Sequence, residues 1–130
     1  MGCNGGWGLT ASKYVYENGI TDETCASYRA RGHTNGVDCT PINKCKNCNP
    51  SGPCFIPDTY NTYGVTEYGR VTEEDNMMNE IYHRGPIMCG VAVPNSLLNY
   101  TGGIYIDTTN DTSIDHEVSV VGWGVEDGVK

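Results

Sequence analysis

The stretch IDHEVSVVGWG, residues 114–124, combines the composition of a β-strand with a histidine that stands between two acidic residues. Val118 and Val120 would lie on one face of such a strand and Trp123 on the other, because side chains alternate along β-structure. A strand of this kind does not need His116 for its packing. The histidine is therefore either a hydrogen-bonded strand-end residue, or a general base or partner for a thiolate.

Two further runs after Pro86 have strand composition, residues 87–93 (IMCGVAV) and 103–106 (GIYI), and the stretch with His116 continues as a strand over 117–125. The half of the chain before Pro86 has no comparable series of strands. A helix-and-loop half followed by a strand-rich half predicts an α+β fold. We expect a partial domain with one portion over 1–70 and another over 71–130.

Two helices are predicted. The first covers residues 9–18 and stops at Gly19. The second begins after Thr72, which can cap it, has Asp75 in a position that resembles a capping box, and ends at Gly85-Pro86. Its apolar face is formed by Met77, Met78, Ile81 and Tyr82.

The segment between the helices, residues 21–70, is rich in Gly, Pro, Asn and Cys and has little periodicity. It is too long for an unconstrained loop in a compact domain. We therefore expect an irregular layer held by disulfides, with short strands around residues 60–71.

The net charge is −8 and the isoelectric point is near 4.6. This balance argues against nucleic acid and anionic membrane surfaces as partners, since both require basic patches. No apolar run approaches the roughly 20 residues of a membrane-spanning helix. The first residues also lack the charged and apolar regions of a signal peptide.

Seven cysteines, four of them between Cys39 and Cys54, favour an oxidising compartment, lysosomal or extracellular. Two N-glycosylation patterns agree with it, Asn99-Tyr100-Thr101 and Asn110-Asp111-Thr112. The odd cysteine count requires at least one partner outside the chain or one free thiol. These observations predict a piece of a longer secretory-pathway protein.

The sequence Cys45-Lys-Asn-Cys48 is a CxxC motif, which suits a redox site, half of a zinc site or ordinary disulfides. A zinc ribbon requires a second CxxC motif and the sequence has none, so disulfides are favoured and no metal is expected. His33, on a polar loop, and His83, near a helix end, are interpreted as structural or solvated.

Four segments in this order resemble papain-type cysteine peptidases: GCNGG at 2–6, GPI at 85–87, NYTGGIY at 99–105 and DHEVSVVGWG at 115–124. The resemblance extends along essentially the whole chain. DETC at 22–25, the cluster at 39–54 and MMNEIYHRGPIMCG at 77–90 resemble the carboxypeptidase members of that family. The family fold has two lobes, and this chain would span the rear of the helical lobe and the first strands of the barrel-like lobe.

In that family a cysteine thiolate attacks the peptide carbonyl, a histidine lowers the pKa of the thiol and protonates the leaving amine, and an asparagine orients the imidazole. The resemblance assigns the histidine role to His116. It implies that a peptide or protein is the substrate, that no cofactor is used, and that the intact parent is a monomer. The residues implied in substrate binding are Gly5, Gly6, Trp7, Gly8, Gly90 and Asp115.

The nucleophile motif, roughly C-G-[SA]-C-[WY], does not occur in the sequence. The typical spacing of such motifs puts the cysteine roughly 14 to 34 positions before Met1. The orienting asparagine is not found between Glu117 and Lys130 either. We therefore expect the chain to be catalytically inactive by itself.

The resemblance also implies the disulfides Cys25–Cys45 and Cys48–Cys54, with Cys3, Cys39 and Cys89 paired outside the chain. Two other hypotheses remain open. One is a disulfide-rich extracellular binding module in which Trp7 and the tyrosines form a recognition surface. The other is a zinc-binding structural domain that uses Cys39, Cys45, Cys48 and Cys54.

Overall fold

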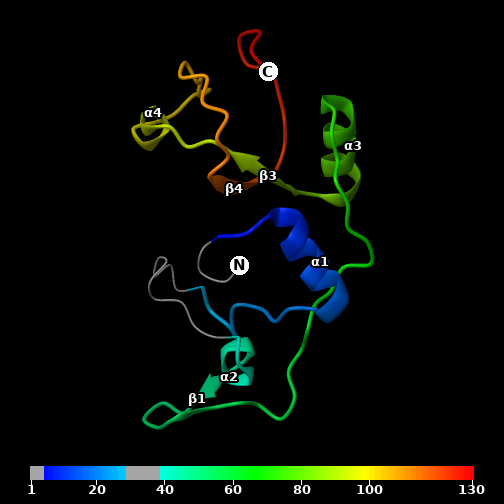
Figure 1. The fold of residues 1–130 in the computed structure, drawn as a ribbon, viewed down its shortest axis with the longest axis vertical. Coiled ribbons are helices and arrows are strands. Elements are labelled where there is room, and N and C mark those ends of the chain that lie inside the picture. Colours follow the sequence, from blue (N-terminus) through cyan, green and yellow to red (C-terminus); the bar gives the residue numbers. More distant parts are fainter. Residues whose placement is uncertain (1–4, 29–38) are drawn as a thin grey trace. The chain divides into compact units, whose positions relative to one another are not determined.

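The structure is a computed structural model that describes residues 5–28 and 39–130. The chain forms two compact units, Met1–Gly69 and Arg70–Lys130 (Figure 1). Helices and antiparallel strand pairs occur together, so the predicted α+β class is confirmed. The expectations for Cys3 and His33 lie outside the described residues.

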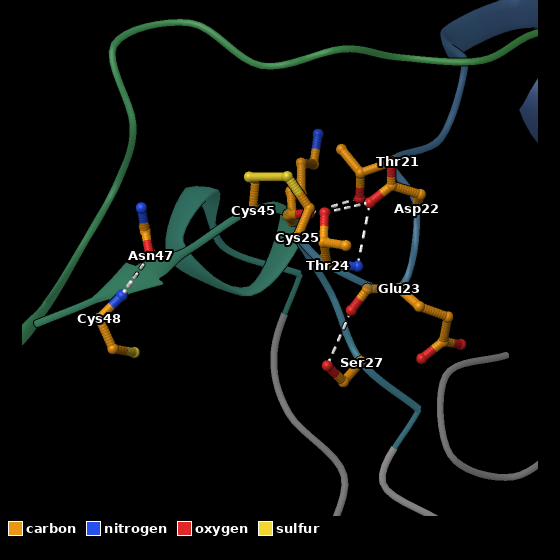
Figure 2. The surroundings of a disulfide bond; sticks show 10 residues. Thr21, Asp22, Glu23, Thr24, Cys25, Ser27, Cys45, Asn47 and Cys48 are labelled. Carbon is orange, nitrogen blue, oxygen red and sulfur yellow. Dashed lines mark hydrogen bonds between the residues drawn. A yellow bond between two sulfur atoms is a disulfide. The ribbon is translucent and has the colours of Figure 1, made fainter. Parts of the chain in front are cut away.

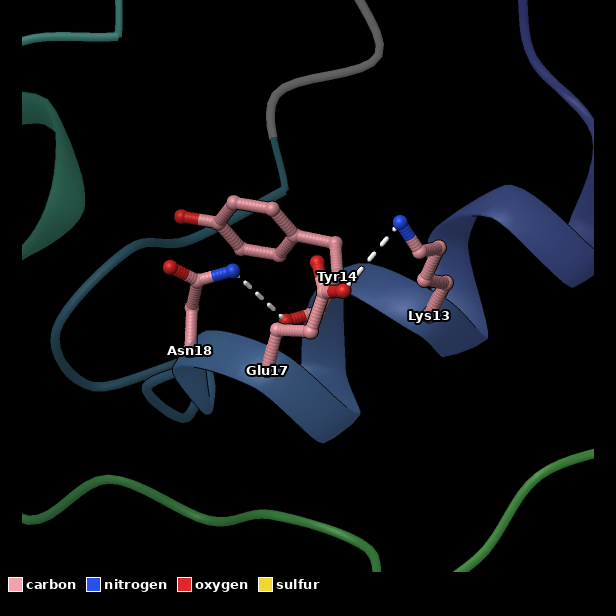
Figure 3. Close-up of polar contacts among 4 residues, drawn as sticks. All are labelled: Lys13, Tyr14, Glu17 and Asn18. Atoms are coloured by element: carbon pink, nitrogen blue, oxygen red, sulfur yellow. Dashed lines mark hydrogen bonds and ion pairs between the residues drawn. The ribbon is translucent and has the colours of Figure 1, made fainter.

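The first unit begins with helix α1 (Gly8–Asn18), which confirms the predicted helix. The carbonyl of Trp7 accepts the first helical hydrogen bonds, and the helix ends at Gly19, whose φ of 68° suits glycine. Lys13 and Glu17, one helical turn apart, form an exposed ion pair with Nζ and Oε1 3.1 Å apart (Figure 3).

The rest of the first unit is short elements joined by two disulfides. They are helix α2 (Pro41–Lys44), strand β1 (Asn47–Cys48) and strand β2 (Cys54–Phe55), with β1 and β2 antiparallel. Proline starts α2, where its missing N–H costs nothing. The bridges Cys25–Cys45 and Cys48–Cys54 are the two pairs that the resemblance implies.

The Cys25–Cys45 disulfide lies at the most enclosed point of the described chain. Cys45 is 1% exposed and is the single buried hydrophobic residue among the described residues. Figure 2 shows the bridge between Cys25 and Cys45. Around it, the Lys46 N–H donates to the Cys25 carbonyl and the Thr21 hydroxyl donates to the Lys44 carbonyl. Covalent and hydrogen bonds therefore hold this segment where apolar burial is small.

The strands predicted around residues 60–71 are absent, apart from one isolated bridge between Ile20 and Tyr63. The two residues exchange both backbone hydrogen bonds, at 2.8 and 2.7 Å. The prediction of strands here is wrong because the threonine and tyrosine composition that suggested them finds only this single pairing partner.

The second unit opens with helix α3 (Glu74–Arg84), which confirms the second predicted helix. The predicted capping is wrong: the residue at the cap position is Glu73, with φ 71° and no side-chain cap hydrogen bond. Thr72 instead contributes its carbonyl, which accepts a hydrogen bond from the Asn76 side chain. On the predicted apolar face, Tyr82 is 75% exposed, whereas the other three residues are half-buried.

Strand β3 (Ile87–Val91) pairs antiparallel with strand β4 (His116–Val120), and the short helix α4 (Asn95–Leu98) lies between them in sequence (Figure 1). The predicted strands at 87–93 and 117–125 are therefore present but shorter. Val121 and Val125 are 74% and 70% exposed, and residues 121–125 have no strand partner in the described part.

The strand predicted over 103–106 does not form, which corrects that prediction. It has the right composition, but none of the described segments pairs with it, and strands are stable only when paired. Across residues 5–28 and 39–130, the structure contains no helix that is both long enough and apolar enough to span a membrane.

Candidate active site

His116 is the first residue of β4 and lies opposite Val91 of β3. Five residue pairs form this ladder, from His116↔Val91 to Val120↔Ile87. Val118 and Val120 are half-buried, whereas His116 is exposed. β-Branched side chains favour the extended backbone and the ladder fixes its register, so the imidazole is placed at an accessible end of a strand pair in fixed register.

Asp115 extends the ladder by one step beyond its last regular pair. Its N–H donates to the Val91 carbonyl at 3.2 Å, and its Oδ1 accepts a hydrogen bond from the Val93 N–H at 3.0 Å. The carboxylate thus replaces the backbone partner that Val93 would otherwise find on a longer strand. The residue directly before His116 is held at two points, which limits movement of the histidine backbone.

Gly90 lies opposite Glu117 in the same ladder and is covered by Ile114. A Cβ atom added at Gly90 would lie 2.6 Å from Ile114 Cγ2, closer than such atoms approach in proteins. The absence of a side chain therefore lets Ile114 lie against the backbone of β3. The structure brings together Gly90, Asp115 and His116 of the predicted site.

Cys89 lies opposite Val118, which is two residues along β4 from His116. Opposed residues, and alternate residues of one strand, point to the same side. Cys89 and His116 therefore share one face of the strand pair. This thiol is free and half-buried, and its Sγ donates a weak hydrogen bond to the Gly90 carbonyl at 3.6 Å. Within the described residues no hydrogen bond joins Cys89 to the His116 imidazole. Cys89 and His116 therefore do not form a thiol–imidazole pair in the described part of the chain.

The other predicted substrate-binding residues belong to the first unit. Gly5 adopts φ 82°, a conformation that glycine tolerates, and it leads through Gly6 to the start of α1. Trp7 is 65% exposed at the N-cap of that helix, and Gly8 is the first helical residue. Gly5, Gly6 and Trp7 are exposed and precede the helix without regular secondary structure, whereas Gly8 is half-buried.

Among the described cysteines, Cys39 is also a free thiol and is exposed. Of the four cysteines in the zinc hypothesis, Cys45, Cys48 and Cys54 are in disulfides. No group of three or more His, Cys, Asp or Glu side chains is placed to hold a metal within residues 5–28 and 39–130. His83 makes an edge-on contact with the Tyr82 ring at the end of α3, with ring centroids 4.9 Å apart.

Two aspartates with lowered pKa values lie in turns. The Thr24 hydroxyl, followed by its N–H, lowers the pKa of Asp22, and the Thr109 N–H, followed by its hydroxyl, lowers that of Asp107. In both cases hydrogen bonds to the ionised carboxylate favour the charged form. These carboxylates organise local backbone turns.

Two of the shallow hollows in the described part of the second unit are not lined by His116. One is lined by Ile104, Gly124, Val125, Glu126 and Lys130. The other is lined by Val93, Pro94, Asn95, Ser96, Thr109 and Asp111.

Residues 1–130 match the family described as papain family cysteine protease. The chain belongs to this family. The papain-type resemblance inferred from GCNGG and DHEVSVVGWG is therefore confirmed.

Several known proteins are similar to this chain. Cathepsin Z of Onchocerca volvulus is 45% identical over 124 residues, which cover 95% of this chain and 39% of the relative. Cathepsin B-like cysteine proteinases 6 and 3 of Caenorhabditis elegans are 28% and 29% identical, over 99% and 98% of this chain and 39% and 37% of their own lengths. The chain thus spans about two-fifths of the length of these papain-family relatives.

Two contacts in this papain-family chain were not anticipated from the sequence. The bond from the Asp115 carboxylate to Val93 joins residues 22 positions apart, so no local pattern signals it. The contact between Gly90 and Ile114 has one signal in the sequence. A glycine inside a strand often marks a position where other atoms approach the backbone closely.

Proposed function

We propose that this chain supplies the imidazole half of the catalytic pair of a cathepsin Z-like cysteine peptidase. One observation carries the proposal: in a chain that matches the papain family over 1–130, His116 stands exposed at the end of a register-fixed ladder, next to a doubly hydrogen-bonded Asp115. A residue that only filled the strand would not need an exposed end.

The chemistry requires a thiolate next to His116. In the described part of the chain, no cysteine is hydrogen-bonded to the His116 imidazole. In the complete site the imidazole takes the proton of a cysteine thiol, and the thiolate attacks the peptide carbonyl. The imidazolium then donates that proton to the leaving amine, and water releases the acyl group in a second step. Cys89 is not assigned the nucleophile role, because its Sγ is directed to the Gly90 carbonyl.

The substrate class is peptides or proteins, bound in extended form. Gly6 would offer its backbone to a substrate strand, with Trp7 and Gly8 beside it, and Gly90 and Asp115 would contribute from the strand pair. The exposed, glycine-rich segment before α1 supports this assignment, because Gly6 has no Cβ atom that could block strand-like pairing.

Removal of C-terminal residues is the reaction that we propose for the complete enzyme. Its support is the similarity to cathepsin Z, 45% identity over 95% of this chain. The secretory pathway, lysosomal or extracellular, is the proposed location, since the two disulfides require an oxidising compartment. The complete enzyme is proposed to be a monomer that needs no cofactor.

A chimera tests the role of His116. The aligned segment of Onchocerca volvulus cathepsin Z is replaced by this chain, and turnover of a fluorogenic peptide is measured. We expect His116→Ala to reduce kcat by about 10² to 10⁴-fold or more, the usual contribution of a general acid–base residue. The matched control, Cys89→Ser, should retain activity in the chimera that folds, because Cys89 is expected to form a disulfide and not to attack the substrate.

The outcome that would contradict the assignment is an active His116→Ala chimera, or a chimera that loses activity with Cys89→Ser while its folding is unchanged. The chain without the added segments should give no turnover. If the isolated chain cleaves the peptide and His116→Ala abolishes that cleavage, the nucleophile is within this chain and the proposal of an outside nucleophile is wrong.

A mass measurement separates the two other hypotheses. Two disulfides remove four hydrogens from the mass of the reduced chain, whereas a bound zinc ion adds metal mass. A binding module would show the disulfide mass together with a stable fold, and its ligand binding would not depend on His116.

A further inference from the structure

We infer that Asp127 is a site of spontaneous isoaspartate formation, whereas folding protects the dipeptide Asn18-Gly19 from the same type of reaction. Ring closure of this kind requires an Asp or Asn side chain whose carbonyl carbon is reached by the next backbone nitrogen, and glycine as the next residue hinders it least. Two such dipeptides lie wholly within the described residues, Asn18-Gly19 and Asp127-Gly128. Two others, at 4–5 and 35–36, include residues outside the described ranges.

The dipeptide Asn18-Gly19 is held by the last turn of helix α1. The Asn18 side-chain nitrogen Nδ2 donates to the Tyr14 carbonyl at 3.1 Å (Figure 3). The Gly19 N–H, which contains the nitrogen that would attack, donates to the Val15 carbonyl at 2.8 Å. Ring closure at Asn18 would break both hydrogen bonds, so the helix end must open before this dipeptide can react.

The dipeptide Asp127-Gly128 forms the tip of a turn in the second unit. On either side of it, Glu126 and Val129 exchange both backbone hydrogen bonds, each at 2.9 Å. Asp127 has φ 51° and Gly128 has φ 81°. Positive φ at both central residues is the pattern of a type I′ turn, for which Asp-Gly is a preferred sequence.

The reacting groups at this tip are not engaged. Both residues are exposed, and in the described part of the chain no hydrogen bond is made by the Gly128 N–H or by the Asp127 carboxylate. The turn is closed by a single isolated bridge and not by a longer ladder. Local opening of the turn therefore needs much less free energy than opening of the end of α1, and it brings the Gly128 nitrogen and the Asp127 side chain within reach of each other.

The reaction needs only water. The Gly128 nitrogen attacks Cγ of Asp127 in its carboxylic acid form; a bond between N and Cγ forms, a Cγ–O bond breaks, and the proton of the nitrogen leaves with the hydroxyl group as water. Water then adds to the ring at the former backbone carbonyl of Asp127, and the bond from that carbon to the Gly128 nitrogen breaks. The product is isoaspartate, whereas addition of water at Cγ restores aspartate.

The product changes the turn, because the main chain then passes through Cγ and is longer by one methylene group. The φ values that suit a type I′ turn no longer apply, so the hydrogen bonds between Glu126 and Val129 should be lost. The β3–β4 ladder ends at Val120, before this turn, and should keep its register. The modification would therefore loosen the segment after β4 without displacing His116.

The experiment incubates the folded, oxidised chain in a mildly acidic buffer, and a parallel sample is reduced and denatured. Peptide mass spectrometry with electron-transfer fragmentation then quantifies succinimide and isoaspartate at each dipeptide. The ratio of the folded rate to the unfolded rate removes the intrinsic difference between Asn and Asp. We expect folding to slow the reaction at Asn18 about tenfold or more, and to change the rate at Asp127 by less than about threefold.

Two variants test the assignment to Asp127. Asp127→Glu should abolish the isomerised product at this position, because the longer side chain would have to close a six-membered ring. Asp127→Asn keeps the five-membered ring and should still form succinimide, with ammonia leaving in place of water. Amide exchange of β3 and β4 should match the original chain in both variants, which shows that the fold is retained.

The inference is overturned if folding slows Asp127 as much as Asn18, or if isomerised product persists at position 127 in the Asp127→Glu chain. It is also overturned if the modified chain keeps slow amide exchange at Glu126 and Val129. None of these measurements uses peptidase activity, so this inference and the proposed function can fail independently.

Discussion

The two units of this chain keep their shapes by different means. In the first unit, disulfides 20 and 6 residues apart close the irregular segment, and Cys45 is the one described hydrophobic residue that is buried. In the second unit, the ladder between β3 and β4 and the side-chain hydrogen bond of Asp115 hold the chain in place. Covalent closure tolerates an open surface, whereas a ladder can fix the position of a functional side chain.

Of the changes that test this difference between the units, removal of the Cys25–Cys45 disulfide should have the largest effect on stability. Cys25→Ser with Cys45→Ser frees a loop with a sequence separation of 20 residues, and chain entropy predicts a cost of about 3 kcal/mol. Hydrogen exchange should accelerate in the first unit and remain unchanged in β3 and β4.

The matched control is Cys48→Ser with Cys54→Ser, which opens a separation of only 6 residues and should cost about 2 kcal/mol. Equal or reversed losses for the two pairs, or faster exchange in the strand ladder, would show that the two units are not stabilised separately as described.

Gly90→Ala should disturb the second unit by about 1–3 kcal/mol, the usual cost of overpacking. The new methyl group would lie 2.6 Å from Ile114 Cγ2, so the Ile114 side chain must move. Thermal denaturation measures the loss. Gly90→Ala combined with Ile114→Ala should recover part of it, and an absence of any recovery would exclude this contact as the cause.

Asp115→Ala should have a smaller effect, about 1 kcal/mol, because one hydrogen bond to the Val93 N–H is lost. In the chimera we expect a reduced kcat that stays well above that of His116→Ala. Asp115→Asn keeps an acceptor oxygen and should restore most of the activity. Equal losses for the Ala and Asn variants would mean that the negative charge matters rather than the hydrogen bond.

The smallest effect concerns pH and the first unit. The Thr24 hydroxyl lowers the pKa of Asp22, so the turn at 22–25 is stabilised above the unfolded pKa of about 3.9 and loses this contribution as the pH falls through the lower folded value. Asp22→Asn should abolish the pH dependence of amide chemical shifts in this turn. Thr24→Val should raise the pKa of Asp22 toward its usual value, and an unchanged pKa would rule out this cause.

The sequence predicted those parts of the fold that depend on local signals. Helix α1 stops at Gly19 and helix α3 stops before Gly85, where positive φ suits glycine. The strand around Val118 was found from its alternation of apolar residues. Family resemblance supplied what composition could not, namely the pairing of Cys25 with Cys45.

The sequence failed where structure depends on a distant partner. Residues 103–106 have strand composition but remain unpaired in the described structure, and the ladder of β4 stops at Val120 for the same reason. The contact of Asp115 with Val93 was also invisible, since nothing in either local sequence requires the other. The positive φ of Glu73 at the start of α3 contradicts the expected Thr72 cap, and no local rule predicts it.

The strand pair β3–β4 has a practical consequence for anyone who handles this polypeptide. Within the described residues no third strand covers either outer edge, and exposed backbone edges of this kind can recruit copies of themselves into growing ribbons. Mutual repulsion from the net charge of −8 opposes such stacking and disappears near pH 4.6. Dilute solutions of low salt concentration, at a pH well above 4.6, should therefore keep the protein dispersed.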